Sequence, residues 1–369
     1  MGIETFSVQY FWNYVRWTYT MLVTLCVIAY NEERFLPGLL HDIINQRYDH
    51  NNIELVFVDN GSQDKTKKIM KSFAAEHTDF FDIKIIEHQK SNQAIGWNTA
   101  FLHTRGNIII KVDAHSKIPA DFVENNVKVI MSGEYVCGGG RPNITLHENN
   151  WGNTLLTAEE GLFGGNFAKY RRVQRKKTYI NSIFNGAYRR DVFAKVGGFN
   201  EALGRTEDNE FHYRIIKAGY KICCSPDIVS YQYIRTSLKK MIVQKYSNGF
   251  WIGLTVKTVP ECLSKFYFVP FAFVLSLIIS TVLAFCGISW LLWAILLAYL
   301  CFDLFITVNA FQKKTRCLHF LLLPLIFPSL HIAFGIGTLV GLVHFPIRKE
   351  KLNKAKRKIR QVKMYYMGN

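Results

Sequence analysis

Four short groups of acidic, amide, imidazole and aromatic side chains hold the residues best suited to chemistry. They are Tyr30-Asn31-Glu32, Asp59-Asn60-Gly61-Ser62, Asp113-Ala114-His115 and Glu207-Asp208. Taken singly, each has an ordinary explanation as turn chemistry, a solvated loop or a helix cap. Three of the groups, however, directly follow apolar runs typical of buried strands. Because open α/β sheets bind ligands at the carboxyl ends of their strands, these groups predict a ligand site at one sheet edge.

The segments between these groups alternate between strand and helix patterns. Short apolar runs predict four strands, at 21–29, 53–58, 83–87 and 107–112. Helical spacing or composition predicts the intervening and following helices, at 34–46, 65–76, 91–103 and 209–218. Fully apolar strands indicate a sheet covered on both faces, so the alternation predicts an α/β fold with a doubly wound sheet.

The composition divides the chain into two unlike parts. Of the 369 residues, 49% are hydrophobic, which excludes a chain that remains disordered. Three nearly continuous apolar stretches exceed the roughly 20 residues that cross a bilayer as a helix, at 266–286, 288–311 and 318–345. The sequence therefore predicts a globular domain followed by a membrane region.

The positive charges bear on topology. Lys and Arg number 45 against 28 Asp and Glu, and many lie in the tail 348–363. Beside an apolar stretch such a run predicts an electrostatic anchor on anionic lipid, and its lack of interleaved aromatic residues disfavours nucleic acid. This tail and the basic loop 313–316 should both be cytoplasmic. One crossing by 318–345 would separate them, so either that proline- and glycine-containing stretch follows a re-entrant path or the charge rule fails here.

These observations predict five regions. An aromatic segment, 1–20, is either an interfacial helix or a helix packed on the domain, and it lacks the features of a signal peptide. The remaining regions are a globular domain, an amphipathic interfacial linker, a membrane region and a basic cytoplasmic tail, at 21–235, 236–265, 266–346 and 347–369.

In their order, the motifs resemble the family 2 glycosyltransferases with the GT-A fold. The matching pieces are VTLCVIAYNEE, VDNGSQDKT, WNTAFLHTRGNIIIKVDAH, NGAYRRDVFAKVGGFNE and RTEDNEFHYRIIKAGYKI. The DAH form, GGGRP and FGGNFAKYRR are most similar to the membrane-bound succinoglycan-type glucosyltransferases of exopolysaccharide synthesis. The resemblance implies a Rossmann-like mixed sheet followed by transmembrane helices.

The resemblance also implies roles for donor-binding residues. Tyr30 would stack on the nucleotide base with Glu32 nearby, and Asp59 and Asn60 would hydrogen-bond the base or ribose. Asp113 and His115 would hold a divalent metal, Mg²⁺ or Mn²⁺, that bridges the donor diphosphate. An alternative is that His115 contacts phosphate and Asp113 alone holds the ion.

Asp208 matches the catalytic base of the family, which accepts the proton of the acceptor hydroxyl. Glu207 would orient the site or the acceptor. The alternative is that both residues simply cap the following helix.

The implied activity is inverting, non-processive transfer of a sugar from a nucleotide donor, expected to be UDP-linked, to a lipid-linked saccharide. Exopolysaccharide or capsule synthesis at the cytoplasmic face of the plasma membrane is the implied setting. Processive relatives carry a Gln-x-x-Arg-Trp element, whereas the segment 244–251 has Gln and Trp at another spacing. The expected partners are the donor, the acceptor and membrane lipid, without nucleic acid. Alternatives are a polyprenyl-phosphate sugar synthase, or a membrane scaffold or transporter with an inactive GT-A domain.

Overall fold

The computed structural model describes residues 21–368 except 90, 147, 162–170 and 314–317, so the predicted N-terminal segment lies outside the described residues. The chain forms two compact units. Unit 1 contains the described residues up to 142 together with 172–232 and 349–368, and unit 2 contains 143–171 and 233–348. These units differ from the predicted regions, because the C-terminal residues join the first unit and a segment near residue 150 joins the second.

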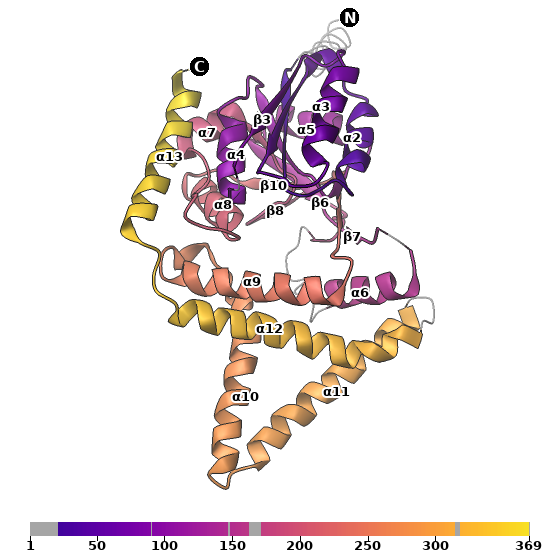
Figure 1. Ribbon diagram of the computed structural model, residues 1–369, viewed down its shortest axis with the longest axis vertical. Helices are drawn as coiled ribbons and strands as arrows, with labels where there is room; N and C mark the ends of the chain where they lie inside the picture. Colours follow the sequence, from indigo (N-terminus) through magenta and orange to yellow (C-terminus); the bar gives the residue numbers. More distant parts are fainter. Residues whose placement is uncertain (1–20, 90, 147, 162–170, 314–317, 369) are drawn as a thin grey trace, which may run out of the picture. The chain divides into compact units, whose positions relative to one another are not determined.

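Unit 1 is built on a mixed sheet of eight strands (Figure 1). The strands are β1 (Val23–Ala29), β2 (Ile53–Asp59), β3 (Asp82–Glu87), β4 (Ile108–Asp113), β6 (Val136–Gly140), β8 (Thr178–Ile180), β9 (Ala187–Arg189) and β10 (Ile222–Val229). Their order is β3-β2-β1-β4-β9-β6-β10-β8, and β8 and β9 run antiparallel to their neighbours. Two short strands, β5 (Ser116–Lys117) and β11 (Tyr231–Tyr233), also pair antiparallel.

Helices cover both faces of this sheet, as the apolar strands predict. They are α2 (Leu36–Ile44), α3 (Thr66–Glu76), α4 (Gln93–Phe101), α5 (Phe122–Met131), α7 (Arg190–Val196), α8 (Glu207–Lys217) and α13 (Lys349–Gly368), with a short 3₁₀ turn at His50–Asn52. Figure 1 shows α2, α3 and α5 on one face and α4, α7 and α8 on the other. The predicted α/β class is confirmed, and all four predicted strands and all four predicted helices form with small shifts at their ends.

Each face of the sheet has its own core, because successive strand residues point to opposite sides. On one face, Val23, Leu25 and Val27 pack with buried residues of α2, α3 and α5. On the other face a cluster of buried rings joins α4, α7 and α8 to the sheet. Its members are Trp97, Phe101, Tyr188, Phe193, Phe199 and Phe211.

The basic C-terminal segment forms α13 and contributes to this second core. The Tyr366 ring stacks on Phe193 with ring centroids 4.9 Å apart, and its hydroxyl donates to the Phe101 carbonyl at 3.0 Å. Tyr365 donates to the Thr104 carbonyl at 2.7 Å. The segment is therefore a packed element of unit 1, with its lysines and arginines mostly on its exposed side.

In the described residues of unit 2, the regular structure is helical apart from the short strand β7 (Asn143–Ile144). Its helices are α6 (Asn150–Glu160), α9 (Leu238–Val256), α10 (Val269–Phe285), α11 (Trp290–Lys313) and α12 (Leu323–Val343), with 3₁₀ turns at Pro260–Cys262, Lys265–Phe268 and Leu318–Leu322. A buried cluster that includes Leu155, Met241 and Phe327 joins α6, α9 and α12. Figure 1 shows α9 and α6 lying along α12, with α10 and α11 leaving them as a hairpin. Three stretches, 265–285, 290–311 and 318–343, are long and apolar enough to cross a membrane.

We predict that Tyr366→Ala destabilises unit 1 by about 3 kcal/mol, because it empties a ring-sized site in the second core. Thermal unfolding of the detergent-solubilised protein, followed by tryptophan fluorescence, measures the effect. Met364→Ala is the matched control, because Met364 lies on the same helix and is 65% exposed. Equal melting temperatures for the two variants would contradict the packing of α13 in this core.

Candidate active site

Parallel pairing brings three of the predicted groups to one edge of the sheet. β1 lies between β2 and β4, with Ala29 opposite Asp59 and Ile28 opposite Asp113. Tyr30 follows β1 directly, and its side chain is 40% exposed. Asp59 and Asp113 therefore end the two strands that flank β1, at the same edge as the accessible ring of Tyr30, and this is the shared edge that the sequence predicts.

The loops after β1 and β2 are joined to each other. Asn31 has a φ of 55°, a left-handed conformation that asparagine tolerates better than most residues. Its backbone N–H donates to Ser62 Oγ at 2.9 Å, and its side-chain oxygen accepts from the Gln63 N–H at 2.8 Å. Asp59 Oδ1 in turn accepts the Ser62 N–H at 3.1 Å. These bonds fix the loops on which Tyr30 and Asp59 lie.

Asn60 is held by α4 and the residues before it. Its side-chain oxygen accepts a hydrogen bond from Ser91 Oγ at 2.9 Å. A Cβ atom at Gly96 would lie 2.7 Å from Asn60 Nδ2, so only glycine leaves room for this side chain. Asn60 is 4% exposed, so its side chain is a fixed, buried part of the packing at this edge of the sheet.

The His115 ring contacts two other side chains at the candidate site. Its Nδ1 lies 3.4 Å from Glu32 Oε1, and its Nε2 lies 3.0 Å from Gln232 Nε2. Glu32, predicted to lie near the nucleotide, and His115, predicted to hold the metal, are thus in contact with each other. Because both ring nitrogens have polar partners, His115 would bind a metal only after losing one of them.

Asp113 presents an unpartnered oxygen instead. Its backbone N–H donates to Asn185 Oδ1 at 3.1 Å, while Asn185 Nδ2 donates to Ser116 Oγ at 3.1 Å. The side chain is 7% exposed, yet Oδ1 has no hydrogen-bond partner. A buried bare carboxylate oxygen suits a hard divalent cation, which typically takes one or two protein carboxylates plus substrate phosphates. No group of three metal-ligating side chains occurs among the described residues, so the remaining ligands would come from the substrate.

Asp208 is held by a lysine inside the sheet. Lys111 lies on β4, two residues before Asp113, and its Nζ donates to Asp208 Oδ1 at 2.7 Å. The ammonium also lies 5.0 Å from the Trp97 ring centroid and 5.7 Å from that of Phe199. Burial alone lowers the pKa of this amine, but the carboxylates of Asp208, Asp113 and Glu207 together hold the pKa of Lys111 above its usual value. Lys111 is therefore a fixed positive charge shared by three carboxylates.

Glu207 and Asp208 occupy the first turn of α8, where the helix dipole favours negative charge. The residue before the helix is Thr206, so neither carboxylate is the capping residue. Glu207 is 3% exposed and its Oε2 has no hydrogen-bond partner. Burial, followed by the charge of Asp208, raises the pKa of Glu207 to about 7. This carboxyl changes charge near neutral pH, unlike an ordinary glutamate.

Two important residues of the site were missed in the sequence prediction. Lys111 stands in the otherwise apolar run NIIIKV, and a charged residue inside a buried strand signals a partner. Its spacing of two residues from Asp113 places both side chains on one face of the sheet. Asn185 gave no comparable signal, because its contact with Asp113 joins residues 72 positions apart.

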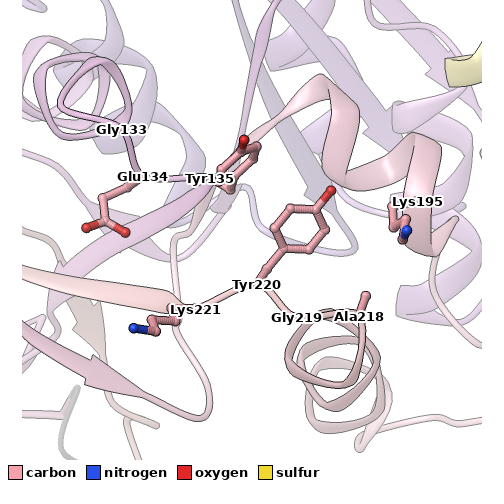
Figure 2. A pocket seen from close by; sticks show the side chains of 8 residues that line it. All are labelled: Gly133, Glu134, Tyr135, Lys195, Ala218, Gly219, Tyr220 and Lys221. Carbon is pink, nitrogen blue, oxygen red and sulfur yellow. The ribbon is translucent and has the colours of Figure 1, made fainter.

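A cavity of about 400 Å³ lies at the opposite edge of the sheet. Figure 2 shows Tyr135 and Tyr220 within it, and their ring centroids are 5.0 Å apart. Tyr135 precedes β6, which runs parallel to β4, so the cavity opens at the amino ends of these strands. It is distinct from the edge that carries the predicted site residues.

We predict that Glu207→Gln changes how stability depends on pH. The raised pKa means that the folded state binds more protons than the unfolded state between about pH 4.5 and 7. The wild-type protein therefore loses stability as pH rises through that interval, and the glutamine variant lacks this loss. Melting temperatures at pH 5, 6, 7 and 8 test the prediction, with the exposed Asp191→Asn as control. A difference between Glu207→Gln and wild type that stays constant over this range would contradict it.

Known proteins are similar to this chain in sequence and in fold. Residues 24–197 match the family model Glycosyl transferase family 2. A dolichyl N-acetyl-α-D-glucosaminyl phosphate 3-β-D-2,3-diacetamido-2,3-dideoxy-β-D-glucuronosyltransferase of Methanococcus voltae is 27% identical over 87% of this chain and 97% of its own. A dolichyl-phosphate β-glucosyltransferase of Trichomonas vaginalis is 34% identical over 34% of this chain and 41% of its own.

The succinoglycan biosynthesis protein ExoA of Rhizobium meliloti is 25% identical over 54% of this chain and 59% of its own. Among solved structures, a mannosyltransferase of Pyrobaculum calidifontis in complex with GDP-mannose and Mn²⁺ has a TM-score of 0.57 at 18% identity, over 90% of this chain and 94% of that one. That likeness agrees with the mixed sheet described above. Residues 24–197 therefore form a family 2 glycosyltransferase domain, and the protein is a glycosyltransferase with the GT-A fold.

Proposed function

We propose that this glycosyltransferase moves a sugar from a nucleotide donor to a polyprenyl phosphate. The observation that carries the proposal is the ion pair of Lys111 and Asp208 at the ligand-binding edge of the sheet, with the unpartnered Oδ1 of Asp113 two residues further along β4. The name of the Trichomonas relative specifies dolichyl phosphate as acceptor, and that of the Methanococcus relative specifies a dolichyl phosphate that already carries N-acetylglucosamine. Long apolar helices in unit 2 suit an acceptor confined to the bilayer, which an anchored enzyme meets at high effective concentration.

In this proposal the donor lies against the loops after β1 and β2. The exposed ring of Tyr30 stacks on the nucleotide base, while Asp59 and Asn60 hydrogen-bond the base or ribose. The predicted donor is UDP-linked, whereas the similar Pyrobaculum structure holds GDP-mannose, so both nucleotides belong in the test. The link between Asn31 and Ser62 supports this role, because it fixes both loops before the donor arrives.

A divalent ion, Mg²⁺ or Mn²⁺, would be held by Asp113 and by oxygens of the donor diphosphate. Bound there, it would stabilise the charge of the departing nucleotide as a Lewis acid. The bare Oδ1 of Asp113 supports this assignment, and Mn²⁺ accompanies GDP-mannose in the Pyrobaculum enzyme. We assign His115 to shaping the site beside the ion, because its two ring nitrogens already contact Glu32 and Gln232.

The role of Asp208 depends on the chemistry of the acceptor. A phosphate acceptor is already ionised near neutral pH, so its attack on the sugar needs no strong base. The role of Asp208 is then to balance the charge of Lys111. Its carboxylate stays bound to that lysine and does not face the anionic acceptor. Glu207, whose pKa is raised by burial, adds little negative charge while it is protonated.

A second candidate is transfer to the hydroxyl of a sugar already carried on a polyprenyl phosphate. The name of the Methanococcus relative, which specifies an acceptor bearing N-acetylglucosamine, favours this candidate. Asp208 would then be the base, and its side chain is 29% exposed, enough for an acceptor to reach it. An exopolysaccharide acceptor of the predicted succinoglycan type has weaker support, because ExoA matches only about half of the chain.

The test uses the full chain in lipid nanodiscs with radiolabelled UDP- and GDP-sugars. The acceptors are a polyprenyl phosphate and the same lipid carrying one N-acetylglucosamine. We predict transfer to the bare phosphate, its loss with EDTA, and a strong reduction by Asp113→Ala. Asp208→Asn should keep transfer to the phosphate within about tenfold of wild type, because no base is required.

Two other outcomes would contradict the proposal. Transfer only to the sugar-bearing lipid, with a loss of about 10²–10⁴-fold in Asp208→Asn, would replace the proposal with the second candidate. Transfer to neither lipid from any donor in the panel would contradict both candidates. Donor binding by calorimetry provides the control, because Asp208→Asn should still bind the nucleotide sugar.

A further inference from the structure

The helix that follows the apolar stretches packs in the same unit as the strands that precede them. α13 begins at Lys349, after the last of the three stretches, yet Tyr365 and Tyr366 bond the backbone near the end of α4. A Cβ at Gly197 would lie 2.3 Å from the Ile359 carbonyl, so α13 also touches the backbone after α7 directly. A bilayer cannot pass through such a core. The chain must therefore cross the membrane an even number of times between β11 and α13.

Of the three candidate stretches, the one containing α12 differs from the other two. In its most apolar window 39% of the residues are buried, against 11% for each of the stretches containing α10 and α11. The difference arises because α12 packs along α9. A Cβ at Gly337 would lie 2.2 Å from the Tyr246 carbonyl, and Lys257 Nζ donates to the His344 carbonyl at 2.5 Å. The two helices thus run parallel and in close contact over several turns.

The helix α9, which packs along α12, cannot lie inside a bilayer. α9 carries Lys239, Lys240 and Lys245, and Lys257 follows its end. Lys245 pairs at 2.9 Å with Glu159 of α6, a helix that belongs to the same packed layer. Each charge at the bilayer centre costs about 2.5–3.5 kcal/mol or more, so a helix with this content belongs at the membrane surface. α12 must lie at a similar depth, because it stays beside α9.

We propose that α10 and α11 cross the bilayer as a hairpin, whereas α12 lies in the membrane surface beside α9, on the face that carries the glycosyltransferase domain. The two crossing stretches have 21 and 22 residues, about 32 Å at 1.5 Å per residue, which matches the hydrocarbon thickness. The hairpin turns at Gly287, where φ is 92°. Trp290 and Trp293 are exposed near this turn, as expected of aromatic residues at the far interface.

This topology also removes a conflict in the charge pattern. The basic loop 313–316 and the basic residues 348–363 should share the cytoplasmic face, yet a crossing between them would separate them. With α12 in the surface, no crossing falls between these two basic stretches of the sequence, so the conflict with the charge rule does not arise. The inference is independent of the donor and the acceptor proposed above.

Cysteine labelling in sealed, right-side-out membrane vesicles tests the proposal. Cys286 lies exposed at the hairpin turn, while the four cysteines of unit 1 are buried and can remain. Cys262, Cys301 and Cys317 are replaced by serine, which leaves Cys286 as the reporter. The matched variants add Cys286→Ser and carry either Met364→Cys or Lys356→Cys on the exposed side of α13.

A membrane-impermeant maleimide added outside should label Cys286 fully and the α13 variants less than about one tenth as much. Lysing the vesicles should restore full labelling of the α13 variants. Labelling of Cys286 and α13 from the same side would overturn the proposal in favour of three crossings. Protection of Cys286 on both sides would overturn the crossing hairpin. Retained sugar transfer by each variant, measured in the same membranes, establishes that the labelled chains are folded.

Discussion

One buried cation holds the candidate site together. Lys111 stands on a central strand among aromatic rings, where an isolated ammonium would be costly. Its bond to Asp208 and the nearby Asp113 and Glu207 make the charged form stable. Without this charge, three carboxylates would repel one another at an edge that must also receive anionic substrates. The orientation of β4 and the position of α8 are thus linked through a single ion pair.

The sequence predicted most of unit 1, because its signals are local. Apolar runs ending in polar groups predicted β1, β2 and β4, and parallel pairing necessarily places Tyr30, Asp59 and Asp113 at one edge. The role of each group remained open, since turns and caps use the same residue types. Only the structure reveals that Asn31 and Ser62 join the loops, that Asn60 fits against Gly96, and that α8 is preceded by Thr206 and not, as predicted, by Asp208.

What the sequence left unpredicted depends on contacts between distant residues. The segment after residue 348 is basic enough to predict lipid binding, and only the tertiary packing of Tyr366 on Phe193 places it in the second core. Hydropathy likewise treats α10, α11 and α12 alike, because composition does not record which helix has a charged neighbour. The glycines that bring α12 against α9 were visible, but their partners lie some ninety residues earlier.

The double-mutant cycle of Lys111→Met and Asp208→Asn tests the central ion pair most directly. Thermal unfolding at pH 7.5, converted to free energies of unfolding, gives the coupling between the two residues. We predict that Lys111→Met alone is strongly destabilising, because it leaves a carboxylate uncompensated, and that adding Asp208→Asn recovers at least about 1 kcal/mol. Effects that simply add would contradict it, because the two side chains would then contribute to stability independently.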